Sequence, residues 1–287
     1  MMLPQPVQPF FQNSIKGLAV GKFKAGKTYT FAQAFNAHYL DGNGQPVYLC
    51  RPALYMDVEG GTQSAEAMVN HPECHYMNVS NLAQFQHGVN LANAGAFRMV
   101  LWDGWTHLFQ KLTAHSHLTK PDKTRGSMKY RLDAFLDVSS ALELWSELAV
   151  TRRGIILLST AALTPAYEGG FDEQKRYIGD TIDVSTKINE RLVGRNNFVW
   201  HFERRDPMPI FIPGGGIDPH ATNLAFAEGR MQASYLTITQ PLASHPYVKA
   251  QQAFAAQLPP VCGPIDLAIV LRDHFILEYH RAQQRAA

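Results

Sequence analysis

The stretch that decides the fold is Gly21-Lys22-Phe23-Lys24-Ala25-Gly26-Lys27-Thr28. It matches the pattern G-x-x-x-x-G-K-[ST] at every fixed position. Gly21 and Gly26 let the loop adopt φ values that other residues avoid, so that successive backbone N–H groups turn inward around an anion. Lys27 adds a positive charge for the β- and γ-phosphates, and the Thr28 hydroxyl is a ligand for Mg²⁺. The segment therefore predicts a phosphate-binding loop, whose contacts extend to Tyr29.

The segments on either side of the loop have the form that such a loop requires. The apolar run Ile15–Val20 enters it as a strand, and a helix over Lys27–Tyr39 leaves it with its positive end facing the phosphates. A Gly- and Lys-rich turn formed by chance is the alternative interpretation, and it requires neither flanking element. The context therefore favours a phosphate-binding loop.

Strands and helices alternate through the first half of the chain. Further apolar runs have the form of buried parallel strands at Ala53–Val58, Tyr76–Val79, Arg98–Trp102 and Ile155–Ser159. Helices are expected at Thr62–Val69, Leu82–Ala94 and Leu132–Thr151. In the last of these, helical spacing places on one face Leu132, Phe135, Leu136, Leu142, Trp145, Leu148 and Ala149. The alternation predicts an α/β fold with an open, mostly parallel twisted sheet and helices on both faces.

The pattern changes after about Thr160. Ala161–Asp183 contains Gly, Pro and acidic residues with little periodicity, and we expect a long irregular excursion there. The elements expected beyond it are a helix at Val184–Val193, hairpin-like strands at Phe198–Glu203, Met208–Ile212 and Ser234–Thr239 with a turn at Gly214-Gly215-Gly216, and a terminal helix at Ile265–Gln284. We therefore expect an N-terminal arm over 1–14, a core over 15–240, and a C-terminal spacer and helix over 241–287.

Composition excludes several classes of protein. Of 287 residues, 46% are apolar and 17% are charged, so a packed core is expected and a disordered chain or a coiled coil is excluded. The net charge is only +2, which excludes a protein that coats nucleic acid over its whole surface. No apolar run approaches the roughly 18 residues of a membrane span, and residues 1–14 do not resemble a secretory signal. Three widely separated cysteines suit a reducing compartment, so we expect a cytoplasmic protein without a membrane partner.

Two acidic residues follow apolar strands and supply carboxylates that a phosphate-binding loop needs. Asp103 ends one such run and is expected to hold Mg²⁺ opposite Thr28. In many ATPases with this loop, a second acid directly follows the first and activates the attacking water, but here Gly104 follows Asp103. Glu59, which follows an earlier strand, can substitute if that strand neighbours the strand that enters the loop. The alternative is that Glu59 is an ordinary loop acid.

This order of motifs resembles the RecA-type ATPase core. In that family the strand, phosphate loop and helix are followed by a strand ending in Asp-x-Glu and then by a metal strand ending in Asp, which correspond here to Asp57-Val58-Glu59 and Val100-Leu101-Trp102-Asp103. The short length makes the chain more similar to the compact RecA-like ATPases encoded by phages, which are associated with single-strand annealing and recombination. The resemblance implies Mg²⁺-dependent ATP hydrolysis by a homo-oligomer that acts on single-stranded DNA. It assigns Glu59 and Lys27 to catalysis and Thr28 and Asp103 to the metal.

The chain departs from the family pattern at two places. The metal Asp is usually followed by Ser and a small apolar residue, whereas Gly104-Trp105 follows it here. A polar sensor, often Gln or His, commonly ends the next strand. Here the run Ile155–Leu158 is followed by Ser159-Thr160, which is a less distinctive pair.

A basic segment follows the predicted metal strand, where RecA-like proteins place a loop that binds single-stranded DNA. Lys111–Arg131 carries six basic residues and one acid, and Pro121 and Gly126 are expected to interrupt any helix there. The residues expected to contact DNA phosphates are Lys120, Lys123, Arg125 and Lys129. The alternative is a solvated loop without a ligand. The second candidate, Ala161–Asp183, is acidic on balance and suits contact with a protein partner.

Two other functions stay open. A nucleotide-dependent assembly or switch protein would bind ATP without acting on DNA, and the indistinct sensor favours it. A nucleotide or nucleoside kinase is the third, but no lid-like cluster of arginines supports it. Arg204 and Arg205 are either charges that reach a neighbouring subunit's nucleotide or exposed edge-strand charges, and Phe10-Phe11 docks either on another subunit or on the chain's own core.

Two sets of histidines lie close together in the sequence and are candidate metal ligands. His71 and His75 flank Cys74, and His115 is two residues from His117. Neither set has the ligand number and spacing of a structural zinc site. The sequence therefore predicts no metal other than Mg²⁺.

Overall fold

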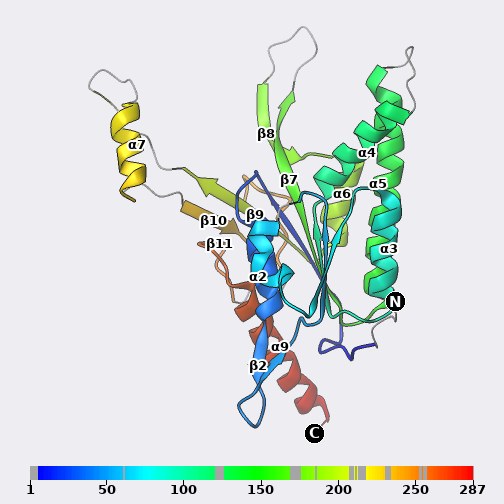
Figure 1. The fold of residues 1–287 in the computed structure, drawn as a ribbon. Coiled ribbons are helices and arrows are strands. Elements are labelled where there is room, and N and C mark those ends of the chain that lie inside the picture. Colours follow the sequence, from blue (N-terminus) through cyan, green and yellow to red (C-terminus); the bar gives the residue numbers. More distant parts are fainter. Residues whose placement is uncertain are drawn as a thin grey trace.

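The computed structural model describes residues 6–60, 62–119, 126–168, 176–184, 186–206, 218–229, 234–251 and 257–286, together with residues 210, 212 and 254. Over these residues the chain has an α/β fold, in which a mostly parallel mixed sheet is covered by helices (Figure 1). The expected fold class is confirmed at that level. Among the helices of this part of the chain, none is long and apolar enough to cross a membrane.

The main sheet is built around the strand that leads into the loop over residues 21–28. Its strands within the described residues are β1 Ile15–Gly21, β4 Ala53–Asp57, β5 Cys74–Asn78, β6 Met99–Asp103, β7 Ile156–Glu168, β8 Arg176–Ile182, β9 Phe198–Arg205, β10 Ser234–Ile238 and β11 Val261–Cys262. Their order is β11-β10-β9-β1-β7-β6-β4-β5, and β8 pairs with β7 off this path. The strands from β9 to β5 run parallel to their neighbours, whereas β10 and β11 add antiparallel pairs at one edge. β7 therefore separates β1 from β6.

Successive side chains of the central strands enter two apolar cores, one on each face of the sheet. On β6, Val100 and Trp102 enter the first core, and Met99 and Leu101 enter the second. The first core is covered by α3 Leu82–Asn93, α4 Trp105–Thr119, α5 Gly126–Thr151 and α6 Thr186–Arg195. The second is covered by α1 Lys27–Gln33 with η1 Ala34–Asn36, by η2 Thr62–Ala65 with α2 Glu66–Val69, and by α9 Leu267–Ala286. Because both faces are covered, these strands consist of continuous apolar runs.

The helix after the loop is shorter than expected. α1 ends at Gln33 and η1 continues to Asn36, while Tyr39 lies in a small separate hairpin of β2 His38–Leu40 and β3 Pro46–Tyr48. The turn of this hairpin is held by Asp41, whose Oδ1 accepts hydrogen bonds from Asn43 N at 2.8 Å and Gln45 N at 2.9 Å. This local turn chemistry ends the helical segment before Tyr39.

The basic segment Lys111–Arg131 is mostly helical, which corrects the expectation of a loop. α4 extends to Thr119 and α5 begins at Gly126, so Gly126 starts a helix instead of interrupting one. The cause is an apolar stripe, since Trp105, Leu108 and Leu112 recur at helical spacing and are buried in the first core. Trp105 meets Trp145 of α5 edge-on at a ring separation of 6.1 Å.

The buried face of α5 also differs from the expected one at its beginning. Leu132 and Leu136 are more than half exposed. The residues that α5 buries are Ala134, Val138, Ala141, Leu142, Trp145 and Leu148. Of the predicted face, Phe135 and the residues from Leu142 onward therefore pack into the first core, whereas Leu132 and Leu136 do not.

The expected irregular excursion over Ala161–Asp183 is instead a long hairpin. β7 continues to Glu168 and pairs antiparallel with β8, with Leu163 opposite Ile182. This hairpin extends past the end of the other strands, toward the same end of the molecule as the distal end of the α4–α5 pair (Figure 1). Both Leu163 and Ile182 are buried at its base, which explains why β7 does not end at Ser159.

Other C-terminal expectations are corrected in part. Of the strand expected at Met208–Ile212, the described residues are Ile210 and Ile212, and neither lies in a strand. The turn at Gly214-Gly215-Gly216 lies outside the described residues. A helix that the sequence did not predict, α7 Pro219–Ala227, stands away from the sheet (Figure 1).

The N-terminal arm packs on the chain's own core. Val7 N donates a hydrogen bond to Gly95 O at 2.9 Å. The ring of Phe10 lies 5.8 Å from that of Phe275 on α9, and Phe11 is buried. Of the two places considered for Phe10-Phe11, the structure therefore shows the chain's own core.

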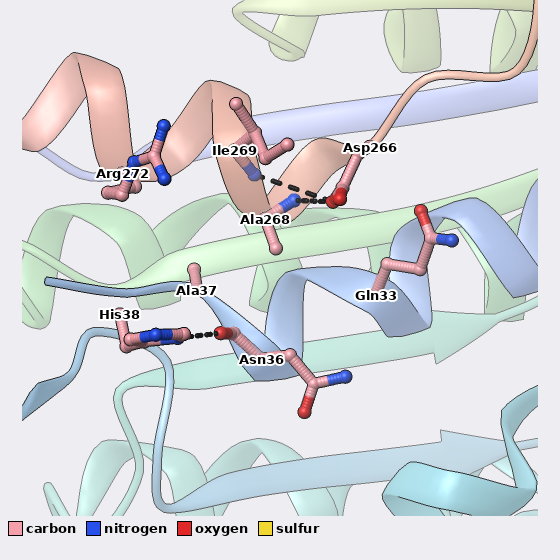
Figure 2. A pocket seen from close by; sticks show the side chains of 8 residues that line it. All are labelled: Gln33, Asn36, Ala37, His38, Asp266, Ala268, Ile269 and Arg272. Carbon is pink, nitrogen blue, oxygen red and sulfur yellow. Dashed lines mark hydrogen bonds between the residues drawn. The ribbon is translucent and has the colours of Figure 1, made fainter. Parts of the chain in front are cut away.

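The C-terminal helix α9 begins against the end of α1 and η1. Asp266 Oδ1 accepts hydrogen bonds from Ala268 N at 3.0 Å and Ile269 N at 3.4 Å, so it caps the first turn of α9. A hollow of about 270 Å³ lies between this turn and residues 33–38 (Figure 2). Its polar side chains hold the helix start and the adjoining turn, and the hollow is a packing feature of this junction.

Replacing Gly17 with Ala is expected to destabilise the protein. A Cβ atom at Gly17 on β1 would lie 2.2 Å from Cζ of the buried Phe198 on β9. Overpacking of this kind costs about 1–3 kcal/mol of unfolding free energy, which equilibrium unfolding in urea measures. Gly42→Ala is the matched control, because nothing lies within 4 Å of its added Cβ. Equal unfolding free energies for the two variants would contradict the packing of β1 on β9.

Candidate functional site

The segment after β1 has the backbone shape of an anion-binding loop. Lys24 has a φ of 60° and Gly26 a φ of 88°, so left-handed residues alternate with right-handed ones and curve the chain around a hollow. Gly21 approaches its neighbour closely, since an added Cβ would lie 2.3 Å from Phe202 O on β9. Residues 23–29 line a cavity of about 360 Å³ together with Glu59, Ser64 and Asp103. The predicted loop residues and both predicted carboxylates are therefore brought together.

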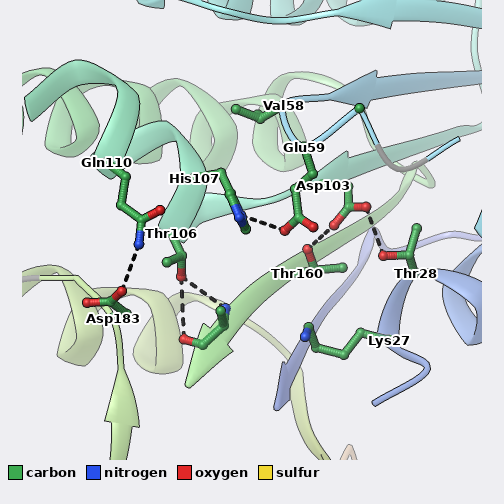
Figure 3. Close-up of polar contacts among 12 residues, drawn as sticks. Lys27, Thr28, Val58, Glu59, Asp103, Thr106, His107, Gln110, Thr160 and Asp183 are labelled. Atoms are coloured by element: carbon green, nitrogen blue, oxygen red, sulfur yellow. Dashed lines mark hydrogen bonds and ion pairs between the residues drawn. The ribbon is translucent and has the colours of Figure 1, made fainter. Parts of the chain in front are cut away.

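Lys27 closes the loop on itself. Its Nζ donates hydrogen bonds to Gly21 O and Lys22 O, both at 2.9 Å, so these two residues contribute carbonyl oxygens to the site. The side chain is buried, and burial lowers the pKa of the ammonium, while the nearby charges of Glu59 and Asp103 oppose that shift. The Lys27 ammonium group therefore lies inside the loop, beside the cavity (Figure 3).

Asp103 is almost completely buried in the site. It is 1% exposed, and its carboxylate accepts hydrogen bonds from the hydroxyls of Thr28 at 2.8 Å, Thr160 and Tyr55 at 3.3 Å (Figure 3). Burial, followed by the repulsion of Glu59, raises the pKa of Asp103 from 3.8 to about 6, although the bonds from the two threonines oppose this shift. A positive charge added next to this carboxylate would therefore stabilise its ionised form.

Thr160 lies between the phosphate loop and Asp103 because of the strand order. On β7 it is opposite Ala19 of β1, and Ser159 before it is opposite Trp102 of β6. Of the expected sensor pair Ser159-Thr160, Thr160 is thus the residue in contact with Asp103. Ser159 turns away, with its hydroxyl 3.4 Å from Gly17 O.

Glu59 reaches the site from a different strand neighbour than the sequence suggested. β4, which precedes it, pairs with β6 and not with β1, so the condition stated for Glu59, adjacency of its strand to the loop strand, is not met. Asp57 ends β4 opposite Asp103, and its Oδ1 accepts hydrogen bonds from Glu59 N and Gly60 N, both at 2.9 Å. Asp57 therefore shapes the turn that delivers Glu59 to the cavity.

His107, which the sequence did not single out, orients the Glu59 side chain. Its Nδ1 lies 2.6 Å from Glu59 Oε1 (Figure 3). Gly104 leaves room for this pair, since a Cβ there would lie 2.7 Å from Thr160 Oγ1 and 3.2 Å from Glu59 Oε1. The departure Gly104-Trp105 from the family pattern thus has a steric reason. The only signal for His107 in the sequence is its place in the first turn of the helix after Asp103.

A second cavity of about 390 Å³ adjoins the first and shares Lys24, Gly26 and Tyr29 with it. Its far side is formed by Tyr235 and Leu236 of β10 and by the segment before α9. Tyr29 and Tyr235 expose a large part of their rings. The phosphate loop is therefore flanked by an aromatic pocket that the sequence did not predict.

The side chains of the four predicted DNA contacts lie outside the described part of the chain. Lys120, Lys123 and Arg125 lie outside the described residues, and of Lys129 only the backbone, in α5, is described. Lys111, from the same segment, donates a hydrogen bond to Val58 O at 2.5 Å and supports the Glu59 turn.

Arg204 and Arg205 have acidic neighbours within the chain. Arg204 Nε lies 2.9 Å from Asp206 Oδ1, and Arg205 Nη2 lies 2.9 Å from Glu203 Oε2. Both arginines are exposed at the end of β9.

Asp103→Asn is expected to gain stability relative to the parent protein as the pH rises from about 4.5 to 8. Because the pKa of Asp103 is about 6 in the folded chain and 3.8 ordinarily, the native state binds more protons between these values. The parent therefore loses stability as the pH rises through this window, by at most about 3 kcal/mol, whereas the amide does not titrate. Urea unfolding of both proteins in EDTA measures the difference at each pH, and a difference that is constant with pH would contradict the assignment.

Comparison of the chain with protein-family models and with curated proteins finds no match. The site's chemistry therefore rests on the geometry of its own residues.

Proposed function

We propose that the chain is a Mg²⁺-dependent ATPase with a RecA-like P-loop core. The observation that carries the proposal is a single cavity of about 360 Å³ shared by the loop, Glu59 and Asp103. These groups come from three separate elements, namely the β1–α1 loop, the turn after β4 and the end of β6. A phosphate loop, a metal carboxylate and a carboxylate for the attacking water are the parts that nucleoside triphosphate hydrolysis requires.

The donor set fits Mg²⁺. Mg²⁺ prefers oxygen ligands, and the Thr28 hydroxyl and the Asp103 carboxylate are in contact at 2.8 Å. The raised pKa of Asp103 reflects its burial and, after that, the negative charge of Glu59, and a bound cation would offset both. When bound, Mg²⁺ would neutralise phosphate oxygens and polarise the terminal phosphoryl group. Thr28 and Asp103 are the residues that would hold it.

The chain's own residues supply binding and proton transfer. Lys27 exchanges its bonds to Gly21 O and Lys22 O for phosphate oxygens, and the amides of the loop bind the remaining phosphate charge. His107 holds Glu59 through Oε1, which leaves Oε2 to accept the proton of the attacking water. His107 is thus a positioning residue.

The aromatic pocket suits the base of the nucleotide. Tyr29 and Tyr235 offer ring faces on which a purine can stack, and Phe202 and Pro264 extend the apolar lining. Its position directly beside the loop matches the short distance between a base and its phosphates. This pocket supports a nucleoside triphosphate as the substrate in preference to an inorganic polyphosphate.

Single-stranded DNA is the proposed partner of the loaded enzyme. α4 begins two residues after Asp103 and leads to the basic segment that contains Lys120, Lys123 and Arg125. A change at Asp103 is therefore passed along one helix to the predicted DNA contacts. Neutralisation of strand phosphates would make the binding dependent on salt.

The long hairpin favours a second candidate, a nucleotide-dependent assembly switch without DNA. Thr160, which bonds Asp103, lies on β7, and the same strand continues into the hairpin that extends past the sheet. A change at the nucleotide can thus move this hairpin, whose sequence suits contact with a protein partner. The two candidates share the ATP site and differ only in what it controls.

Glu59→Gln is expected to preserve ATP binding and to lower ATP turnover by about two orders of magnitude or more, because the amide cannot accept the proton of the attacking water. Binding is measured with a fluorescent ATP analogue, and turnover by phosphate release. The exposed Glu66→Gln on α2 is the matched control and should leave both unchanged.

In contrast, Lys27→Ala should weaken nucleotide binding, and unchanged affinity in that variant would overturn the P-loop assignment.

Replacing Lys120, Lys123, Arg125 and Lys129 together with Ala is expected to weaken binding of single-stranded DNA about equally for different sequences, because phosphate contacts carry no base preference. Fluorescence anisotropy with two oligonucleotides at two salt concentrations measures this. Lys187→Ala on α6 controls for loss of charge alone. If the parent binds no DNA, or if the four substitutions change nothing, the assembly switch becomes the better description.

A further inference from the structure

A second cluster of metal-ligating side chains lies at the end of β9. His201 and Glu203 are two residues apart on this strand, so both side chains leave the same face. His245 approaches them from the segment after β10. One ligand atom from each residue lies within 4.8 Å of the others, and in the described part of the chain this is the one such group of three His, Cys, Asp or Glu side chains.

Both imidazoles direct Nε2 toward the same carboxylate oxygen. Glu203 Oε1 lies 3.8 Å from His201 Nε2 and 3.5 Å from His245 Nε2. With metal–ligand bonds of about 2.0–2.2 Å, neighbouring ligand atoms of a tetrahedral zinc site lie roughly 3.3–3.6 Å apart. Small side-chain movements would therefore close the three atoms around an ion.

Each histidine is held from its other ring nitrogen. His201 Nδ1 is hydrogen-bonded to the Tyr247 hydroxyl, and His245 Nδ1 lies 2.8 Å from Ser244 Oγ. Metal-ligating histidines characteristically have such outer partners, which fix the ring and its tautomer. Here both partners leave Nε2 free to face the centre of the cluster.

The supporting segment is fixed to β9 by its backbone. Val199 N donates to Lys249 O at 2.9 Å, and Lys249 N donates to Val199 O at 3.0 Å. The cluster is therefore arranged before any ion arrives.

The cluster opens on a cavity of about 420 Å³. The opposite side of this cavity contains Lys22 and Asp180, whose charged groups lie 3.3 Å apart. Two imidazoles and a carboxylate suit zinc better than Mg²⁺, which prefers oxygen ligands. Three protein ligands with space for a fourth are typical of zinc sites that keep one open position.

We propose that His201, Glu203 and His245 bind one zinc ion, with the fourth position open to water or a small anion in the cavity. The ion fastens residues 244–249 to β9. The three ligands are separate from the residues that line the proposed nucleotide cavity, so zinc binding can be tested without nucleotide.

Zinc binding by the full chain is measured after removal of metals with a chelator, by competition with a chromophoric zinc indicator, in excess Mg²⁺ and without nucleotide. We expect one zinc ion per chain. His245→Ala should weaken its binding by about 100-fold or more and Tyr247→Phe by about 10-fold, since loss of an outer partner alone costs 10–100-fold. His220→Ala, an exposed histidine of α7, is the control and should bind zinc as the parent does.

Cobalt in place of zinc tests the ligands directly. A four-coordinate site of nitrogen and oxygen ligands gives strong visible bands without thiolate charge-transfer absorption. If His245→Ala fails to fold by circular dichroism, Glu203→Gln provides the same test of ligation. Absence of a bound equivalent, affinity unchanged in the folded ligand variants, or a thiolate band from a cysteine such as Cys74 would each overturn the proposal. None of these readouts depends on ATP hydrolysis, so failure here leaves the proposed function unaffected.

Discussion

The burial of one carboxylate, that of Asp103, is the constraint on which the site depends. A buried charge is costly unless other groups compensate for it, and here the compensating hydroxyls come from α1, β7 and β4. The positions of these three elements are thus tied to a single side chain. The hydroxyls do not fully compensate, as the pKa of about 6 shows. A nearby positive charge would therefore stabilise the ionised carboxylate of Asp103. This property suits the metal-binding role that we propose for Asp103.

The parts that could be predicted from the sequence are those whose chemistry is local. The loop over residues 21–28 depends on its own glycines and lysine, and the runs that became β1, β4 and β6 are apolar because both faces are covered. Asp103 was found because it ends such a run. The place of Glu59 after a strand makes it a candidate, although the condition attached to it, adjacency of β4 to β1, is not met. Its turn instead reaches the site because β4 neighbours β6.

The parts that escaped prediction depend on pairings between distant segments. Thr160 meets Asp103 only because β7 lies between β1 and β6, and no local pattern states that order. The hairpin of β7 and β8 could not be predicted because its sequence lacks the alternating pattern of strands. Its two segments are strands because they pair with each other. α4 was missed for a different reason. Its positive charges suggest a loop, but charge does not decide whether a segment packs as a helix. The apolar spacing of Trp105, Leu108 and Leu112 does, and all three side chains are buried.

The end of β9 links the two candidate sites through the backbone. Phe202 lies between the two ligand residues His201 and Glu203, and its carbonyl oxygen is the atom that a Cβ at Gly21 would meet at 2.3 Å. The same short stretch therefore limits the start of the loop over residues 21–28 to glycine and carries two of the three proposed zinc ligands. Lys22 joins both regions as well, because its carbonyl accepts a hydrogen bond from Lys27 and its ammonium pairs with Asp180. An ion that stiffens β9 at this point would stiffen the strand against which the loop is formed, without any contact with the nucleotide.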